Sequence, residues 1–159
     1  WEGSREFEGL LGTWAARLNR FGGEAIQLFG LRGATDVTGF GLGGHVLEMA
    51  QASKVRMDIW GSAVPVLDQV QDLAAMGLIP AGSYANKHFC ESMVSIAPEV
   101  DPLMVDIIFD AQTSGGLILS VPQARLRETR DFLIQNGDLA AHIGEVHPLG
   151  GGTPGMAIQ

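Results

Sequence analysis

Residues 35–45 bring together the residue types that bind metal ions and phosphates. They read Thr-Asp-Val-Thr-Gly-Phe-Gly-Leu-Gly-Gly-His, so a carboxylate, a hydroxyl and four glycines come ahead of an apolar helical pattern. Asp36 offers a hard anionic oxygen, which Mg²⁺ binds together with phosphate oxygens and water. Thr38 can donate its hydroxyl to a phosphate, and a glycine such as Gly39 lets backbone N–H groups approach an anion closely. These residues predict a metal-assisted anion site.

The same stretch also has a purely structural interpretation. Asp and Thr are common N-terminal caps, so Asp36 and Thr38 could serve only to begin a helix, with the glycines allowing tight packing. The glycines do not form a Walker A loop, because no Lys follows them at the required position. The residue types alone leave both interpretations open.

Three further residues near such a site have two readings each. His45 could contact phosphate when protonated, but we favour a packing or hydrogen-bonding role. Thr113 and Ser114 precede a pair of glycines, and they could face phosphate or shape the entrance to a strand.

Composition limits the classes of protein to which the chain can belong. Its 159 residues suit one domain, and 46% hydrophobic with 18% charged residues predicts a globular chain without a membrane span. The formal charge of -8 would repel nucleic acid, whose binding needs Lys and Arg. We therefore expect no nucleic-acid and no membrane partner, and a phosphate ligand would need a metal ion or backbone donors.

The lone cysteine and the first residue bear on compartment and completeness. Cys90 has no disulfide partner and no charged, apolar leader opens the chain, which favours the cytoplasm. His88 and Cys90 make a poor zinc pattern without a second cysteine, so we expect Cys90 to be a packing residue of the core or a residue of the surface. The chain begins at Trp1 instead of Met, which suggests a piece of a longer protein.

Hydrophobic periodicity predicts the elements that must hold residues 35–45 in place. Helical spacing occurs over residues 6–31, 41–52, 66–76 and 102–109, and another helix is expected from Pro122 to residue 137. Strand patterns occur over residues 55–60, 117–121, 140–146 and 156–158. This mixture predicts a single α+β domain over residues 1–159, with a mixed β-sheet packed against α-helices.

Glycines and prolines predict where these elements stop. Gly22 and Gly23 mark an expected break in the first helical segment. Residues 80–86 are expected to form a loop, followed by a short helical piece within residues 88–96. Residues 150–152 are three glycines among prolines, which favours a hairpin turn between the two closing strands over a phosphate loop.

Two sequence motifs resemble those of a known family, which the spacing of hydrophobic residues does not reveal. Residues 35–41, Thr-Asp-Val-Thr-Gly-Phe-Gly, resemble the signature of selenophosphate synthetases, also called selenide, water dikinases. Residues 110–117, Asp-Ala-Gln-Thr-Ser-Gly-Gly-Leu, resemble the Asp-Pro-Gln-Thr-Ser-Gly-Gly-Leu stretch of that family. Gly43 and Ala111 depart from the family, which commonly has Leu and Pro there. Weaker agreement at Ser83, Asn86 and elsewhere extends the resemblance over nearly the whole chain.

The resemblance implies a fold and an activity. The fold would be the C-terminal domain of the aminoimidazole ribonucleotide synthetase-like superfamily, within a two-domain, magnesium-dependent homodimer. That family, a class of phosphotransferase, converts ATP, selenide and water into selenophosphate, AMP and phosphate. Its reactive Cys or selenocysteine, essential Lys and other metal-binding Asp residues belong to the N-terminal domain, so no catalytic residue is expected in this chain.

The resemblance also assigns roles to residues of this chain. Asp36 corresponds to the Mg²⁺ ligand that the C-terminal domain contributes. Thr38 and Gly39, singled out above by residue type, are the expected phosphate or ATP contacts beside it. A chain without the N-terminal domain is expected to be inactive.

Two other functions remain open on the sequence. The chain could be a non-catalytic binding or scaffold module of the same fold, in which case its lack of a nucleophile would be genuine. It could also be the C-terminal domain of another ATP-dependent member of the superfamily, although the sequence of residues 36–41 argues against this. An upstream domain with Cys or selenocysteine, Lys and acidic motifs would favour the synthetase.

Overall fold

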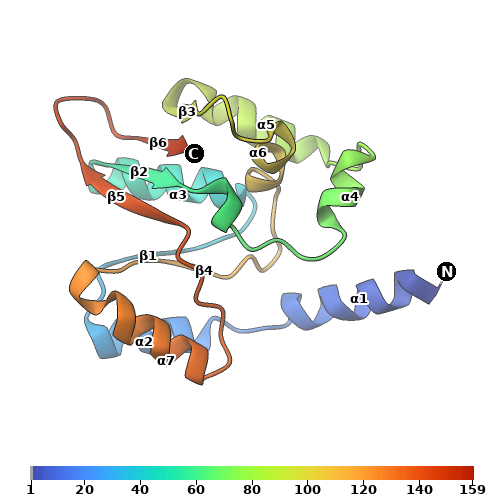
Figure 1. Ribbon diagram of the computed structural model, residues 1–159, viewed down its shortest axis with the longest axis horizontal. Helices are drawn as coiled ribbons and strands as arrows, with labels where there is room; N and C mark the ends of the chain where they lie inside the picture. The colour runs from blue at the N-terminus through green and yellow to red at the C-terminus, as the bar shows by residue number, and fades with distance from the viewer. Residues whose placement is uncertain (1) are drawn as a thin grey trace.

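Two β-sheets organise the fold, and helices flank both of them (Figure 1). The computed structural model describes residues 2–159, and Trp1 lies outside the described residues. The strands within this range are β1 (Gly33–Asp36), β2 (Val55–Ile59), β3 (Val94–Ile96), β4 (Leu117–Ser120), β5 (Gly144–Pro148) and β6 (Gly155–Ile158). β1 and β4 form an antiparallel pair, whereas the larger sheet has the order β3-β6-β2-β5.

The larger sheet is mixed, as the sequence predicts. β6 lies parallel to both β2 and β3, and β5 lies antiparallel to β2. The helices are α1 (Glu2–Ala15), α2 (Arg20–Phe29), α3 (Gly41–Ser53), α4 (Val70–Ala75), α5 (Ala81–Cys90), α6 (Pro102–Ile108) and α7 (Leu126–Gln135). Short 3₁₀ turns occur at Gly61–Ala63, Glu91–Met93 and Gln123–Arg125. The expected α+β fold is confirmed.

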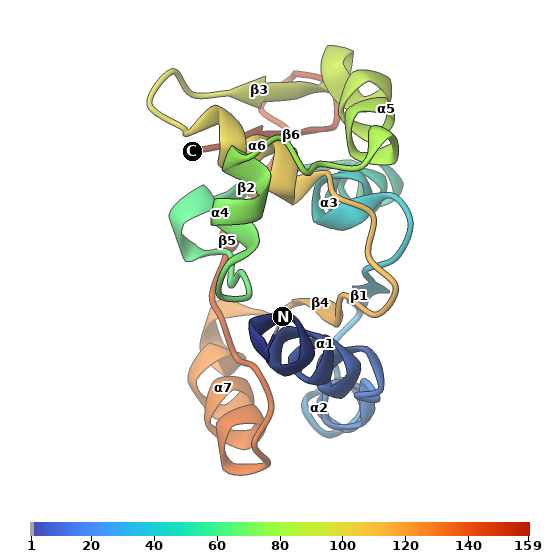
Figure 2. The same cartoon turned by 90° about the vertical axis from the view of Figure 1, so that its right-hand side faces the viewer.

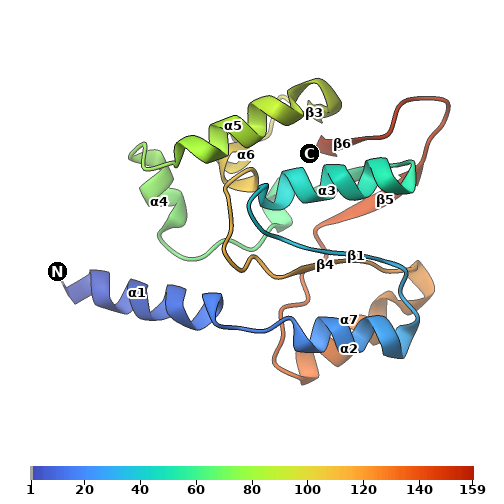
Figure 3. The same cartoon turned by 180° about the vertical axis from the view of Figure 1, so that it is seen from behind.

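The two sheets lie at different levels of the molecule. Figure 2 shows the larger sheet with α3 to α6 in the upper part and the β1–β4 pair with α2 and α7 in the lower part. α3 contacts β2 and β6 of the larger sheet and also β1 of the smaller one. Seen from behind, α3 runs alongside the β1–β4 pair, while α1 extends away from the rest of the fold (Figure 3).

The main core lies between α3, α6 and the larger sheet. Its most deeply buried apolar side chains include Val46 of α3, Ile108 of α6 and Ile158 of β6, each at most 1% exposed. Full burial of such a side chain stabilises the folded state by about 1.5–3 kcal/mol relative to exposure. Because α3 contributes one wall of this core, the position of its first turn is fixed. None of the helices in residues 2–159 has the length and apolar character needed to cross a bilayer.

The first helical segment breaks at a different place from the one expected. α1 ends at Ala15 and α2 begins at Arg20, so Gly22 and Gly23 lie inside α2. A Cβ atom at Gly22 would lie 2.8 Å from Cδ2 of Leu117. Gly22 therefore brings α2 close to β4 and does not interrupt the helix.

The prediction of a loop over residues 80–86 is wrong. These residues begin α5, which runs from Ala81 to Cys90. The short helical piece expected within residues 88–96 is present as the end of α5 and the 3₁₀ turn Glu91–Met93, and β3 follows it. The helix expected over residues 66–76 is shorter, because α4 begins only at Val70. Gly77 ends this segment as expected, with a left-handed φ of 80°.

The closing strands do not form the expected hairpin. β5 and β6 both pair with β2, which lies between them. The three glycines at residues 150–152 therefore connect two strands that flank a third one. Turn residues and strand patterns gave the right elements here, but they do not predict that an earlier strand is inserted between them.

Candidate functional site

The two sequence motifs form one structural unit. Residues 36–41 connect β1 to α3, and residues 110–117 connect α6 to β4. The N–H of Val37 donates to the carbonyl oxygen of Gly116, and the N–H of Gly115 donates to the carbonyl oxygen of Val37, both at 3.0 Å. The N–H of Gln112 donates to the carbonyl oxygen of Thr38, also at 3.0 Å. Stretches that are far apart in the sequence therefore lie side by side as two bonded loops.

Side chains from α5 tie these loops to the upper part of the fold. Nδ2 of Asn86 donates to the carbonyl oxygens of Gly39, at 2.9 Å, and of Phe109, at 3.1 Å. The hydroxyl of Ser83, which is 1% exposed, donates to Oδ1 of Asp110 at 2.6 Å. Since Nε2 of Gln112 donates to the other oxygen of this carboxylate at 3.1 Å, Asp110 holds the second loop in place.

Asp36 lies at the end of β1, where the chain enters the first loop. Its strand partner is Leu117 of β4, the residue at which the second loop ends. The side chain of Asp36 is exposed, whereas the next residue, Val37, is 3% exposed and anchors the loop. The structure therefore presents one carboxylate to solvent beside the two bonded loops.

Neither Asp36 nor Thr38 caps α3. The N-terminal cap position is occupied by Phe40, and no side chain accepts a hydrogen bond there. Oγ1 of Thr38 instead lies 3.0 Å from Nε2 of His45. The hydrogen-bonding role expected for His45 is confirmed, and the capping interpretation of the motif does not describe this structure.

The four glycines of residues 35–45 have different surroundings. At Gly41, where φ is 69°, a Cβ atom would lie 2.7 Å from the carbonyl oxygen of Asp110. At Gly43 and Gly44 it would lie 2.6 Å from the ring of Phe109 and from Cβ of Phe40, respectively. At Gly39, by contrast, an added Cβ atom would have no heavy atom within 4 Å apart from its neighbours in the chain. Three glycines thus allow close packing, and Gly39 borders open space.

The chain matches one known protein family over most of its length. Residues 16–155 match the family described as AIR synthase related protein, C-terminal domain. The chain belongs to this family. The matched range contains both loops and all of the side chains that tie them together.

Two curated relatives of this AIR synthase related domain carry the name selenide, water dikinase. The chain is 51% identical over 159 residues to the selenide, water dikinase of Nitratidesulfovibrio vulgaris strain Hildenborough, covering 100% of the chain and 45% of that protein. It is 40% identical over 134 residues to the selenide, water dikinase of Clostridioides difficile strain 630, covering 84% of the chain and 38% of that protein. The chain thus spans less than half the length of these relatives.

A solved structure supports the fold of this AIR synthase related domain. The hydrogenase maturation protein HypE matches with a TM-score of 0.50 and 21% sequence identity, over 79% of this chain and 32% of that one. At this level of identity the likeness shows the fold alone.

The cysteine of this AIR synthase related domain lies in the core, which is one of the two places expected for it. Burial of the Cys90 thiol, which is 3% exposed, raises its pKa, and the negative charge of Glu48 raises this pKa further. The thiolate is the reactive form of cysteine, so a raised pKa makes Cys90 a poor nucleophile. The packing role predicted for Cys90 is therefore confirmed.

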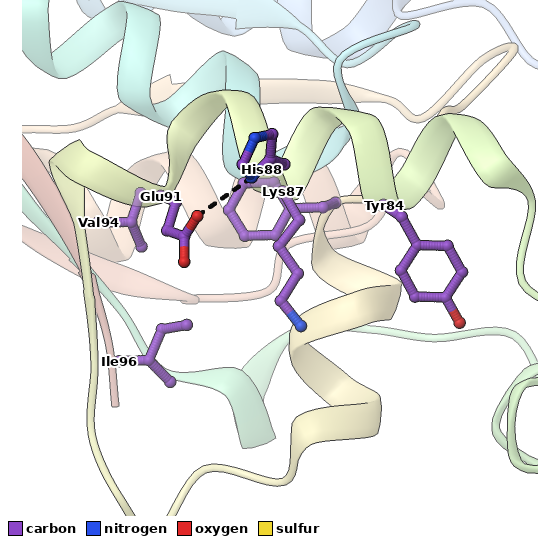
Figure 4. Close-up of a pocket in the computed structure, with 7 residues that line it drawn as sticks. Tyr84, Lys87, His88, Glu91, Val94 and Ile96 are labelled. Atoms are coloured by element: carbon purple, nitrogen blue, oxygen red, sulfur yellow. Dashed lines mark hydrogen bonds and ion pairs between the residues drawn. The ribbon is translucent and has the colours of Figure 1, made fainter.

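A hollow of about 320 Å³ lies beside α5, and Phe109, the residue before the second loop of this AIR synthase related domain, is among its lining residues. Figure 4 shows Tyr84 and Lys87 of α5 and Ile96 of β3 among the residues that line it. Nζ of Lys87 lies 2.6 Å from Oδ1 of Asp106, so its charge is already paired. Asp36, Thr38 and Gly39 are not among the residues that line this hollow. The sequence did not predict the hollow, because the first part of α5 was expected to form a loop.

Proposed function

We propose that this chain is the C-terminal domain of a selenide, water dikinase, which makes selenophosphate, AMP and phosphate from ATP, selenide and water. The observation that carries the proposal is the 51% identity to a protein of that name over the whole chain. The hydrogen bonds between the two motif loops give it a structural basis, because the residues that resemble the synthetase signature meet in one place. Neither the scaffold module nor another superfamily enzyme has comparable support.

The reaction would require the rest of the protein. This chain spans less than half the length of the curated relatives that it matches, for example 45% of one of them. The buried Cys90, with its raised pKa, is a poor candidate for the reactive thiol. The nucleophile and the basic ATP contacts would therefore come from an N-terminal domain, and we expect no turnover by residues 1–159 alone.

Asp36 would be the Mg²⁺ ligand of this domain. Its exposed carboxylate fits the preference of Mg²⁺ for hard oxygen ligands. No group of three or more His, Cys, Asp or Glu residues able to hold a metal ion occurs in the described part of the chain. A Mg²⁺ ion at Asp36 would therefore share its remaining positions with phosphate oxygens, water and carboxylates of the N-terminal domain. Bound Mg²⁺ would neutralise charge that develops on the phosphates.

Thr38 and Gly39 would lie on the phosphate side of this site. Gly39 is exposed, and the space around it allows a phosphate to approach the backbone. Thr38 follows Asp36 by two residues, so a group bound at Asp36 would lie within reach of both. We also propose that the intact protein acts as a cytoplasmic homodimer that binds ATP and selenide and has no nucleic-acid or membrane partner.

The proposal can be tested by removing the Asp36 carboxylate from the full-length protein. Asp36→Ala should raise the Mg²⁺ concentration needed for half-maximal selenophosphate formation by roughly 10–100-fold, a typical cost of weakening a metal site. Asp72→Ala is the matched control, because Asp72 is an exposed carboxylate on α4, outside the two loops. Normal activity and unchanged Mg²⁺ dependence of Asp36→Ala would remove Asp36 from the site.

A further inference from the structure

Helix α1 carries an apolar stripe that the described fold leaves uncovered. The stripe follows the spacing of one helical face and consists of Phe7, Leu10, Leu11 and Trp14. Leu10 is 38% exposed and Leu11 is 40% exposed. None of the side chains that the structure describes in α1 is buried, whereas α2 and α3 both contain buried residues. Figure 3 shows why, because α1 extends away from the rest of the fold.

The sequence of α1 does not favour a helix that stands alone. Isolated helices shorter than about 12–15 residues are marginal in water, and α1 has 14 residues. Three of them are glycines, and glycine is the poorest helix former apart from proline. An added Cβ at Gly9 or Gly12 would meet nothing within 4 Å, so no packing contact in this chain requires these two glycines. Packing of the apolar stripe against a partner would supply the missing stability.

Arg17 holds the C-terminal end of α1 to the domain. Its guanidinium forms an ion pair with Asp138 at 3.1 Å and donates to the carbonyl oxygen of Gly137, and both residues follow α7. The same guanidinium lies over the ring of Trp14, 5.2 Å from the ring centroid. These contacts set the direction in which α1 leaves the domain, so the stripe has a defined place relative to α7.

Two comparisons indicate which partner covers the stripe. The match to the AIR synthase related C-terminal domain begins at residue 16 and leaves out α1, whereas the match to the Nitratidesulfovibrio vulgaris protein covers the whole chain. α1 thus lies outside the C-terminal domain of the family but within the part shared with a selenide, water dikinase. The chain spans 45% of that relative, so more than half of the relative lies outside the match. A covalently attached domain would also meet α1 at a high effective concentration, which a second copy of the chain would lack.

The charge of α1 argues against a lipid surface as the partner. Helices that lie on membranes are rich in Lys and Arg on their polar face. α1 carries three glutamates and one arginine, so its net charge is negative.

We propose that α1 docks its apolar stripe onto the N-terminal domain of the full-length protein and fixes that domain relative to this one. The inference rests on the proposal above that the chain is the C-terminal part of a longer protein. It assigns an interaction surface to a helix that lies outside both sequence motifs. The Mg²⁺ site proposed at Asp36 needs carboxylates of the N-terminal domain, so the docking of α1 would help to complete that site without contributing a ligand.

The test measures hydrogen exchange of the α1 amides in the full-length protein. Leu11→Asp should raise the exchange rates of residues 7–15 by roughly tenfold or more, the factor expected when the burial of one Leu side chain is lost. Leu10→Ala is the milder variant and should raise the same rates by a smaller factor. Gly12→Asp is the matched control, because it places the same charge one residue further along, away from the stripe. Its exchange rates should match those of the unmodified protein.

Several results would overturn the inference. Equal exchange rates in Leu11→Asp and Gly12→Asp would show that nothing covers the stripe. If Leu11→Asp dissociates an oligomer in analytical ultracentrifugation, the stripe is covered by a second copy. If the unmodified protein sediments with phosphatidylglycerol vesicles and Leu11→Asp does not, the partner is a lipid surface.

Selenophosphate formation by the unmodified full-length protein, measured in parallel, separates this inference from the proposed function. If selenophosphate forms while Leu11→Asp and Gly12→Asp exchange alike, only the inference fails. If no selenophosphate forms while Leu11→Asp alone accelerates exchange, the docking of α1 stands and the proposed activity fails.

Discussion

Two glycine-rich segments of this chain look similar in sequence and have opposite surroundings. At Gly41, Gly43 and Gly44 in residues 35–45, an added Cβ would lie within 2.7 Å of atoms in Phe40, Phe109 or Asp110. At residues 150–152, between β5 and β6, an added Cβ would meet nothing within 4 Å. The first segment is glycine-rich because neighbours leave no room, and the second is an open connection. The number of glycines therefore does not identify a binding loop, and the contacts around each glycine do.

The largest effect should follow from a methyl group at Gly41. Gly41→Ala combines a left-handed φ of 69° with a contact of 2.7 Å to a backbone carbonyl oxygen that cannot easily move. We expect the free energy of unfolding to fall by about 2–4 kcal/mol in urea denaturation. Gly39→Ala is the control and should change the free energy of unfolding by less than about 0.5 kcal/mol. The reason is that an added Cβ atom at Gly39 would meet nothing within 4 Å. Equal losses of unfolding free energy in Gly41→Ala and Gly39→Ala would contradict the difference in packing between these two glycines.

A somewhat smaller effect is expected at the contact between the two loops. A Cβ at Gly115 would lie 2.7 Å from Cγ1 of Val37, a buried side chain of the first motif. Gly115→Ala should therefore lower the free energy of unfolding by about 1–3 kcal/mol, the typical cost of overpacking. The double variant Gly115→Ala with Val37→Ala should recover part of this loss relative to the sum of the single changes. If the losses of the two single variants simply add in the double variant, the side chains at these two positions are not in close contact.

The smallest effect is expected in the open segment. Gly150→Ala adds a methyl group where no atom lies within 4 Å, at a residue without left-handed backbone geometry. The free energy of unfolding should stay within about 0.5 kcal/mol of the unmodified value, measured in the same urea experiment. A loss of more than about 1 kcal/mol would mean that this segment is packed, and the comparison between the two segments would collapse.

Elements with strong apolar periodicity were predictable from the sequence. The helical spacing predicts α3 and α6, and period-two or compact apolar runs predict β2 and β4 within one or two residues. α5 was not predictable, since Gly82, Ser83 and Asn86 favour a loop by local preference. Ser83 and Asn86 instead donate hydrogen bonds to Asp110, Phe109 and Gly39, so long-range contacts outweigh the local preference.

The sequence predicted which residues belong to the candidate site better than it predicted the hydrogen bonds that hold them in place. The motifs identify Asp36, Thr38 and Gly39 as candidates, and their roles as ligands remain predictions. The link from Thr38 to His45 has a signal in the sequence, because a hydroxyl precedes a helix that carries a His and a Glu three residues apart. The bonds between the two loops have no such signal, since they depend on how β1 and β4 pair.

The position of β6 has a consequence for the synthesis of the protein. β6 follows the other described strands in the sequence, yet it lies between β2 and β3 and joins them. On the ribosome, both neighbours emerge long before the strand that connects them. A nascent chain halted before residue 155 would hold two unsatisfied strand edges, which are sites of self-association. Half of the larger sheet therefore depends on a translation step that comes after the two motif loops have already been made.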